Sequence, residues 1–197
     1  MTHHLPSTLR RVQDAGHKVF TTGDYNLNIV GVRTASRTSN AFDDNLFCVY
    51  RAEEEWKLWH WYITTDPGTY YLENPMNVNG TAILCAGQHR GAWQFGVHRS
   101  KYPALVQQKP VKVWRDSNRD ATINLDIPNP VAQEGFWGLN FHRSSNKGST
   151  KVGKWSAGCQ VFAHPTDFIQ FLGLCSKQIE NSPGKSWDTF TYTLLED

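Results

Sequence analysis

The chain has 197 residues, 39% of them hydrophobic and 13% aromatic, with 20 Lys and Arg against 18 Asp and Glu. Such a composition can bury enough apolar surface to offset chain entropy, which argues against a disordered protein. A net charge of +2 without a basic stripe argues against a nucleic-acid-binding surface, and the length suits one domain.

The first 16 residues are predicted to form a helical segment. Ser7 can cap a short helix over residues 8–16, and Gly16 can end it. The segment lacks the apolar run of a signal peptide, and no later run reaches membrane-spanning length. We therefore expect a protein that is cytoplasmic where it is made and does not insert into a membrane.

Short apolar or alternating runs, rich in β-branched and aromatic residues, follow this segment and are separated by turn residues. Their density predicts a mainly β domain. The expected strands lie within residues 26–34, 45–52, 56–65, 80–87, 91–98, 111–116, 136–143 and 187–195. No linker or low-complexity stretch divides the chain, so residues 1–197 are expected to form a single domain and a monomer.

One polar segment between these runs invites a calcium interpretation. Asp116, Asn118 and Asp120 occupy positions 1, 3 and 5 of an oxygen-ligand loop. Position 6 is Ala121 rather than Gly, and position 12 is Ile127 rather than a bidentate Glu. A polar turn is therefore favoured over a cation site, and we expect neither a metal nor another cofactor.

A late helix is predicted to begin at Pro165, because proline is tolerated in the first helical turn. Apolar residues then recur at helical spacing and form one face, namely Phe168, Phe171, Leu172 and Cys175. Cys175 is therefore expected to be buried, as are Cys48 and Cys85 in their strand-like runs. The cysteines show no disulfide-scaffold or zinc-finger spacing and are expected to be reduced thiols.

The remaining cysteine, Cys159, has neighbours in sequence that suit a catalytic thiol. His142 ends one strand-like run and Cys159 precedes another, so folding can bring an imidazole base to a thiol nucleophile. Gly158 permits a tight backbone, the amides of Gly158 and Cys159 can face an oxyanion, and Ser156 can orient the site. Residue types alone leave open a buried thiol and a structural histidine.

The segment from His142 to Cys159 resembles the signature of the L,D-transpeptidase catalytic-domain family. That signature is a histidine, a polar spacer containing glycine, and Ser/Thr-His-Gly-Cys; here it ends in Ser156-Ala157-Gly158-Cys159. The resemblance implies a β-sandwich or barrel in which Cys159 attacks a peptidoglycan stem peptide to form a thioester, with His142 as its base. The sequence departs from the family at Ala157, where the family has His, and at Gln160 and Val161, where it places Arg or Asn.

Three further residues are predicted to bind substrate. His98 also ends a strand-like run, and the choice between His98 and His142 as base stays open. Arg143 can clamp a carboxylate and Trp155 can wall the cleft. The tripeptide His-Arg-Ser occurs at residues 98–100 and 142–144, which is too short to indicate an internal repeat.

The expected function is hydrolysis of peptidoglycan stem peptides, as an L,D-carboxypeptidase or endopeptidase. A chain without an export signal or wall-binding module is typical of a phage lysis enzyme or an antibacterial effector, which reaches the cell wall after release or delivery. Two alternatives stay open: a true L,D-transpeptidase, and a domain that binds wall peptides without turnover.

Overall fold

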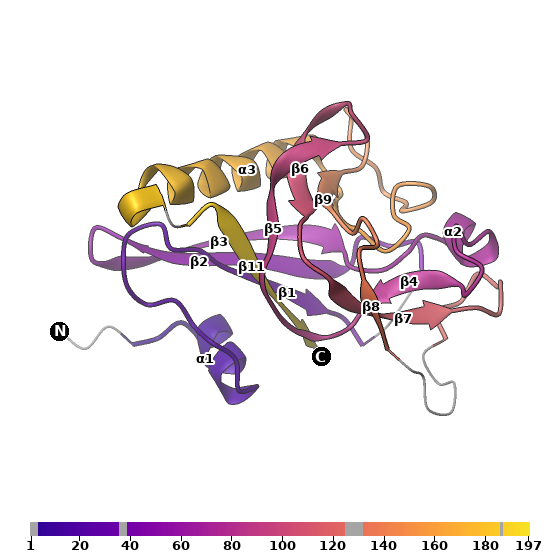
Figure 1. The fold of residues 1–197 in the computed structure, drawn as a ribbon, viewed down its shortest axis with the longest axis horizontal. Helices are drawn as coiled ribbons and strands as arrows, with labels where there is room; N and C mark the ends of the chain where they lie inside the picture. Colours follow the sequence, from indigo (N-terminus) through magenta and orange to yellow (C-terminus); the bar gives the residue numbers. More distant parts are fainter. Residues whose placement is uncertain (1–3, 36–38, 125–131, 186) are drawn as a thin grey trace.

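Eight strands close into a mixed β-barrel in the computed structural model, which describes residues 4–35, 39–124, 132–185 and 187–197 (Figure 1). Neighbouring strands are antiparallel except for the parallel pairs β1–β11 and β9–β10. In order around the barrel, the strands are β1 (Asn28–Arg33), β11 (Thr189–Glu196), β5 (Gly87–His98), β6 (Tyr102–Gln107), β9 (Phe141–Arg143), β10 (Gln160–Phe162), β3 (Glu55–Thr64) and β2 (Asp44–Ala52). The prediction of a mainly β protein with a short N-terminal helix and a late helix is confirmed.

A separate three-stranded sheet lies beside the barrel, in the order β4 (Thr81–Leu84), β7 (Val111–Asp116) and β8 (Gln133–Gly135) (Figure 1). The sequence patterns missed β6, β8 and the single-turn helix α2 (Thr69–Glu73). Both β8 and α2 are short, and β6 contains Pro103, which weakens a strand signal. The strand predicted over residues 136–143 is shorter than expected, since Gly138 takes a positive φ of 70° and strand β9 begins only at Phe141. A 3-10 helix (Pro183–Lys185) precedes β11.

Helix α1 (Ser7–Asp14) covers the outer face of the barrel. Its buried residues Leu9 and Val12 pack with Val30 and Val32, which explains why every residue of β1 is buried. The expected cap at Ser7 is wrong: Ser7 is the first helical residue, and Pro6, whose ring fixes φ, precedes it.

The barrel interior is filled by aromatic side chains. Trp93 meets Phe141 and Tyr192 edge to face, with ring centroids 5.3 Å and 5.7 Å apart. The Tyr192 hydroxyl occupies the space that a side chain at Gly31 would need, and it donates a hydrogen bond to Gln160 Oε1 at 2.8 Å. Gln160, one of the positions where the sequence departs from the family signature, therefore points into the barrel.

Helix α3 (Pro165–Glu180) begins at Pro165 as predicted and packs along the barrel (Figure 1). Phe171 contacts Trp61, Phe141 and Phe162, which ties the helix to the main core. The buried face of α3 differs slightly from the predicted one, because Leu172 is only half-buried. The buried residues of the helix are Phe168, Phe171, Leu174, Cys175 and Gln178. Within the described ranges, no helix is long and apolar enough to cross a bilayer.

Alanine at Cys175 is expected to lower the free energy of unfolding by roughly 1–3 kcal/mol, because it leaves a small cavity in the main core. Cys48, Cys85 and Cys175 are buried free thiols, as predicted. Urea unfolding followed by circular dichroism measures the change. Ile169→Ala is the control on the same helix: its side chain is 66% exposed, so we expect a change of about 0.5 kcal/mol or less. Equal losses in both variants would contradict the assignment of this face.

Candidate active site

The parallel pairing of β9 and β10 brings the two halves of the predicted site to one edge of the barrel. His142 pairs with Val161, and the Gln160 amide donates to the Asn140 carbonyl at 3.0 Å. Cys159 immediately precedes β10, and since Gln160 pairs with Phe141, Cys159 lies beside Asn140, two positions before the residue that pairs with His142. The long loop between the two strands contributes part of the groove described below.

The turn before Cys159 is shaped by Ser156 and Gly158. The buried Ser156 hydroxyl accepts a hydrogen bond from the Gly158 amide (3.1 Å) and donates one to the Cys159 carbonyl (3.0 Å). Gly158 has a φ of 113°, and a side chain there would collide with the Ala82 carbonyl, so only glycine fits. Because the Gly158 amide is engaged, its predicted role as an oxyanion donor is wrong. The Cys159 amide is the remaining candidate of the pair.

The Cys159 thiol is in a neutral resting state. Its side chain is 9% exposed, and the Sγ atom donates a long hydrogen bond to the Gly138 carbonyl at 3.6 Å. Burial raises the pKa of the thiol to about 11, against a lowering effect from the Asn140 amide and the Arg99 guanidinium. Among the described residues the thiol bonds to a carbonyl and not to an imidazole, so the predicted contact with His142 is not formed in this conformation.

The two histidines differ in which ring nitrogen is free. His142 is 3% exposed, and its Nδ1–H donates a hydrogen bond of 2.9 Å to the Arg143 carbonyl, which can only be an acceptor. The lone pair of His142 is therefore on Nε2. In His98 the Nδ1 atom accepts from the Asn140 amide at 3.2 Å, so its lone pair is occupied. These contacts assign the available base nitrogen to His142.

Burial keeps both imidazoles neutral. The rings of His98 and His142 stack with centroids 4.1 Å apart. Burial, reinforced by this neighbour, lowers the pKa of His142 to about 3. Burial, with Arg99 and Lys101, lowers the pKa of His98 to about 4. The site therefore holds a neutral thiol and a neutral base, and not a thiolate–imidazolium pair.

A groove of about 750 Å³ opens beside these residues. It contains all three predicted substrate-binding residues, His98, Arg143 and Trp155, together with His142. Trp155 is 41% exposed and can form a wall, as predicted. The Cys159 side chain is not part of the groove lining, although the effect of Arg99 on its pKa puts the thiol within electrostatic reach of the groove.

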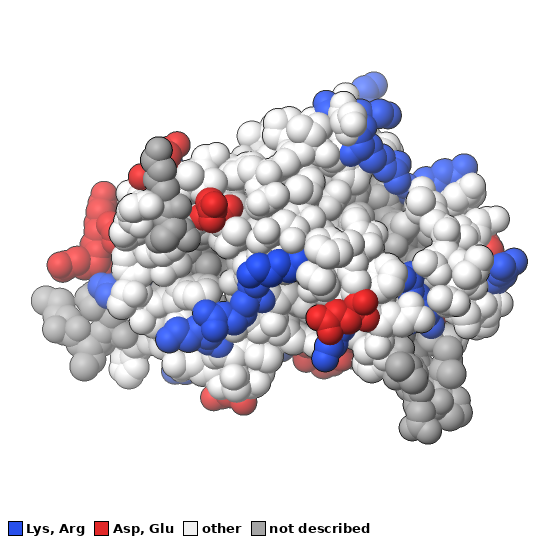
Figure 2. Space-filling model, viewed as in Figure 1, with Lys and Arg blue, Asp and Glu red and all other residues white. Residues whose placement is uncertain are grey.

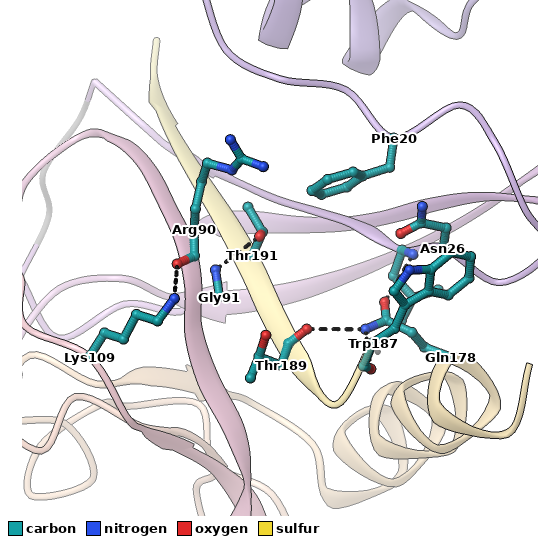
Figure 3. A pocket seen from close by; sticks show the side chains of 10 residues that line it. Phe20, Asn26, Arg90, Gly91, Lys109, Gln178, Trp187, Thr189 and Thr191 are labelled. Atoms are coloured by element: carbon teal, nitrogen blue, oxygen red, sulfur yellow. Dashed lines mark hydrogen bonds between the residues drawn. The ribbon is translucent and has the colours of Figure 1, made fainter. Parts of the chain in front are cut away.

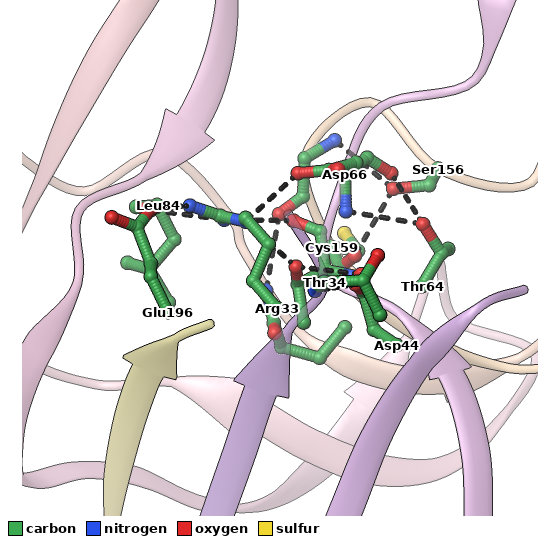
Figure 4. A network of polar contacts seen from close by, with 12 residues as sticks. Arg33, Thr34, Asp44, Thr64, Asp66, Leu84, Ser156, Cys159 and Glu196 are labelled. Atoms are coloured by element: carbon green, nitrogen blue, oxygen red, sulfur yellow. Dashed lines mark hydrogen bonds and ion pairs between the residues drawn. The ribbon is translucent and has the colours of Figure 1, made fainter. Parts of the chain in front are cut away.

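A buried polar network supports the loop that carries Cys159 (Figure 4). Arg33, only 1% exposed, donates to the Thr65 hydroxyl at 2.9 Å and pairs with Asp66 at 3.0 Å. Two residues further along, the Gly68 amide donates to the Ser156 carbonyl at 2.9 Å. This chain of contacts fixes the turn before the thiol to the barrel wall. No sequence motif predicted this polar network.

Sequence reasoning also missed the role of Asn140. Its side-chain amide donates to His98, its side-chain oxygen accepts from the Gln107 amide (3.0 Å), and its backbone amide lowers the pKa of Cys159. Asn140 therefore connects the second histidine to the thiol. Its position two residues before His142 is the only signal in the sequence, and that signal is weak.

The loop that contains Asp116, Asn118 and Asp120 is not part of this site. Asp116 accepts from the Asn124 amide at 2.8 Å, and Asn118 donates to Asp120 at 2.8 Å, which supports the polar-turn interpretation. Ile127 of the same segment lies outside the described residues. Across the ranges that the structure describes, no group of three or more His, Cys, Asp or Glu side chains is arranged to hold a metal.

A second hollow, of about 490 Å³, lies between β5, β11 and the end of α3 (Figure 3). It is lined by Phe20, Arg90, Lys109 and Trp187 among others, and it contains none of the predicted site residues. Lys109 donates to the Arg90 carbonyl there at 3.3 Å.

Comparisons with protein-family models, with curated proteins and with solved structures find no match to this chain.

Alkylation of Cys159 by iodoacetamide is expected to accelerate about tenfold per pH unit from pH 7 to 10. The thiolate is the reactive form, and the pKa of the thiol is raised to about 11, so the thiolate fraction grows with pH throughout this range. Mass spectrometry of the modified peptides separates Cys159 from the other three cysteines. A rate that is flat between pH 5 and 8 would instead reveal a thiolate–imidazolium pair.

Proposed function

We propose that this protein is a cysteine hydrolase of peptidoglycan stem peptides with an L,D-transpeptidase-like architecture. One observation carries the proposal: two neighbouring parallel strands hold a histidine whose Nδ1 is engaged, so that Nε2 is its basic nitrogen, and a thiol at the start of the next strand, and the histidine lines an open groove. The resemblance of the segment from His142 to Cys159 supplies the substrate class. The mainly β barrel is compatible with that family.

In the proposed reaction, both the Cys159 thiol and the His142 imidazole are neutral before the substrate is attacked. The thiol leaves the Gly138 carbonyl and attacks the substrate carbonyl carbon, while its proton passes to Nε2 of His142. The C–S bond forms, the C–N bond breaks, and the imidazolium returns the proton to the leaving amine. Water then attacks the thioester with His142 again as base; the acid product departs and the thiol is restored. The Cys159 amide stabilises the oxyanion in both steps.

The charge of the groove favours water over an amine as the second nucleophile. Four cationic side chains line it, and none of its described lining residues is Asp or Glu. An acceptor amine that approaches as an ammonium is repelled by these cations, whereas neutral water is not. We therefore place hydrolysis ahead of transfer, with transpeptidation as the alternative.

Incubation with purified muropeptides, followed by mass spectrometry of the products, tests the proposal. Shortened stems or split dimers are the expected result. New dimers or exchanged D-amino acids would replace hydrolysis by transfer. Unchanged muropeptides that still bind would identify a wall-peptide-binding domain without turnover.

A further inference from the structure

The groove beside His142 is strongly cationic although the whole chain carries a net charge of only +2. Its four cations are Arg99, Lys101, Arg143 and Lys154. The loop over residues 143–154 carries four Lys and Arg and no Asp or Glu. Figure 2 shows blue side chains gathered at the upper right, over the β5–β6 turn and the region beside it. A cluster of four cationic side chains therefore lines the proposed active-site groove.

Two of these four cations lie over aromatic rings. The guanidinium of Arg143 lies 4.1 Å from the ring centre of Tyr102, and the ammonium of Lys154 lies 4.1 Å from that of Tyr70. Such contacts reduce the entropy that a side chain loses when it binds a ligand. The groove therefore presents ordered positive charge.

The turn that carries Arg99 is built against local preference. Arg99 and Ser100 both take positive φ angles, 48° and 55°, between the strands β5 and β6, and the Lys101 amide closes the turn on the His98 carbonyl at 2.9 Å. Two-residue turns of this kind strongly prefer Asn-Gly. An arginine at the first position costs local backbone energy, a pattern found at functional sites. This turn sets Arg99 at the rim, where its charge reaches Cys159.

We infer that the groove selects peptides with a free carboxylate next to the bond to be cut, and that Arg143 and Arg99 are the residues that recognise it. Guanidinium groups bind carboxylates with two parallel hydrogen bonds, which a neutral carboxamide cannot reproduce. The inference rests on the proposed function and narrows it to a carboxypeptidase that acts on acidic stem peptides. Arg143 and His142 line the same groove, so a carboxylate held by Arg143 shares that groove with the base.

The test uses a stem tetrapeptide that ends in a free D-Ala carboxylate and the same peptide with a C-terminal carboxamide. The wild-type protein is expected to cleave the acid with a kcat/KM at least about tenfold higher than that for the amide, the usual size of a charge-assisted hydrogen bond. Arg143→Gln is expected to raise KM for the acid more than for the amide, and so to bring the ratio of the two kcat/KM values close to one. Arg143→Lys retains the charge and is expected to restore part of the preference for the acid.

Lys109→Gln is the matched control, because it removes one positive charge from the second hollow and leaves the groove intact. It is expected to keep the full preference for the acid. Equal cleavage of both peptides by the wild type would overturn the inference and leave the proposed function standing. If neither peptide is cleaved, the proposed function fails and calorimetry decides the inference: tighter binding of the acid supports it, and equal binding overturns it.

Discussion

Alanine at position 159 is expected to abolish peptide cleavage, with kcat reduced by roughly 10⁴-fold or more, because no thioester can form without the sulfur. The barrel is expected to remain folded, since the change removes one atom from a side chain at the end of a strand. Far-ultraviolet circular dichroism checks the fold, and product release from muropeptides, followed by chromatography, measures the rate.

Cys85→Ala is the matched control for this experiment. Cys85 is 8% exposed against 9% for Cys159, and burial raises the pKa of both thiols to about 11. Cys85 follows β4 in the separate three-stranded sheet and does not line the groove, so its loss is expected to leave the rate within a factor of two. Turnover retained in the Cys159 variant, or lost equally in both variants, would remove the nucleophile assignment.

The class of fold could be predicted from local patterns, but the closure of the barrel could not. Hydrophobic periodicity located seven of the barrel strands or their neighbourhoods, because each run reflects burial on at least one face. The parallel pairing of β1 with β11 joins segments from opposite ends of the chain. No local pattern encodes that contact, since it depends on the sum of side-chain volumes inside the barrel, including the space that Gly31 leaves for Tyr192.

The motif located residues of the candidate site, and it could not predict the tertiary contacts around them. It pointed to Cys159, Ser156, Gly158 and His142; the structure connects the first three by hydrogen bonds in one turn and places His142 on the neighbouring strand. The motif did not predict that the Gly158 amide is already engaged or that the thiol turns to Gly138.

The two His-Arg-Ser tripeptides lie close together in the folded protein, although their length did not indicate an internal repeat. The two histidines stack 4.1 Å apart, and both arginines line the groove. The meaning of the repeat depends on the path from β5 through β6 to β9, which places the two copies side by side. Spacing along the chain cannot reveal such a juxtaposition.

Alanine at His142 is expected to lower kcat by roughly 10²- to 10⁴-fold at pH 7, because it removes Nε2, the nitrogen to which we assign the base. The dependence of the cleavage rate on pH tests whether His142 is the base. Burial lowers the pKa of His142 to about 3, so the imidazole stays neutral and the wild-type rate is expected to be flat between pH 5 and 9. In the variant only solvent deprotonation supplies thiolate, and the rate is expected to rise about tenfold per pH unit toward the thiol pKa of about 11.

His98→Ala separates this role from that of a merely buried ring. The lone pair of His98 is occupied by Asn140, so its loss leaves Nε2 of His142 available and is expected to cost no more than about tenfold in kcat. The pH profile of this variant is expected to stay flat, because the base is still present. A steep profile in the His98 variant together with a flat one in the His142 variant would exchange the two assignments, since the group that supplies the base is the one whose removal makes the rate follow hydroxide.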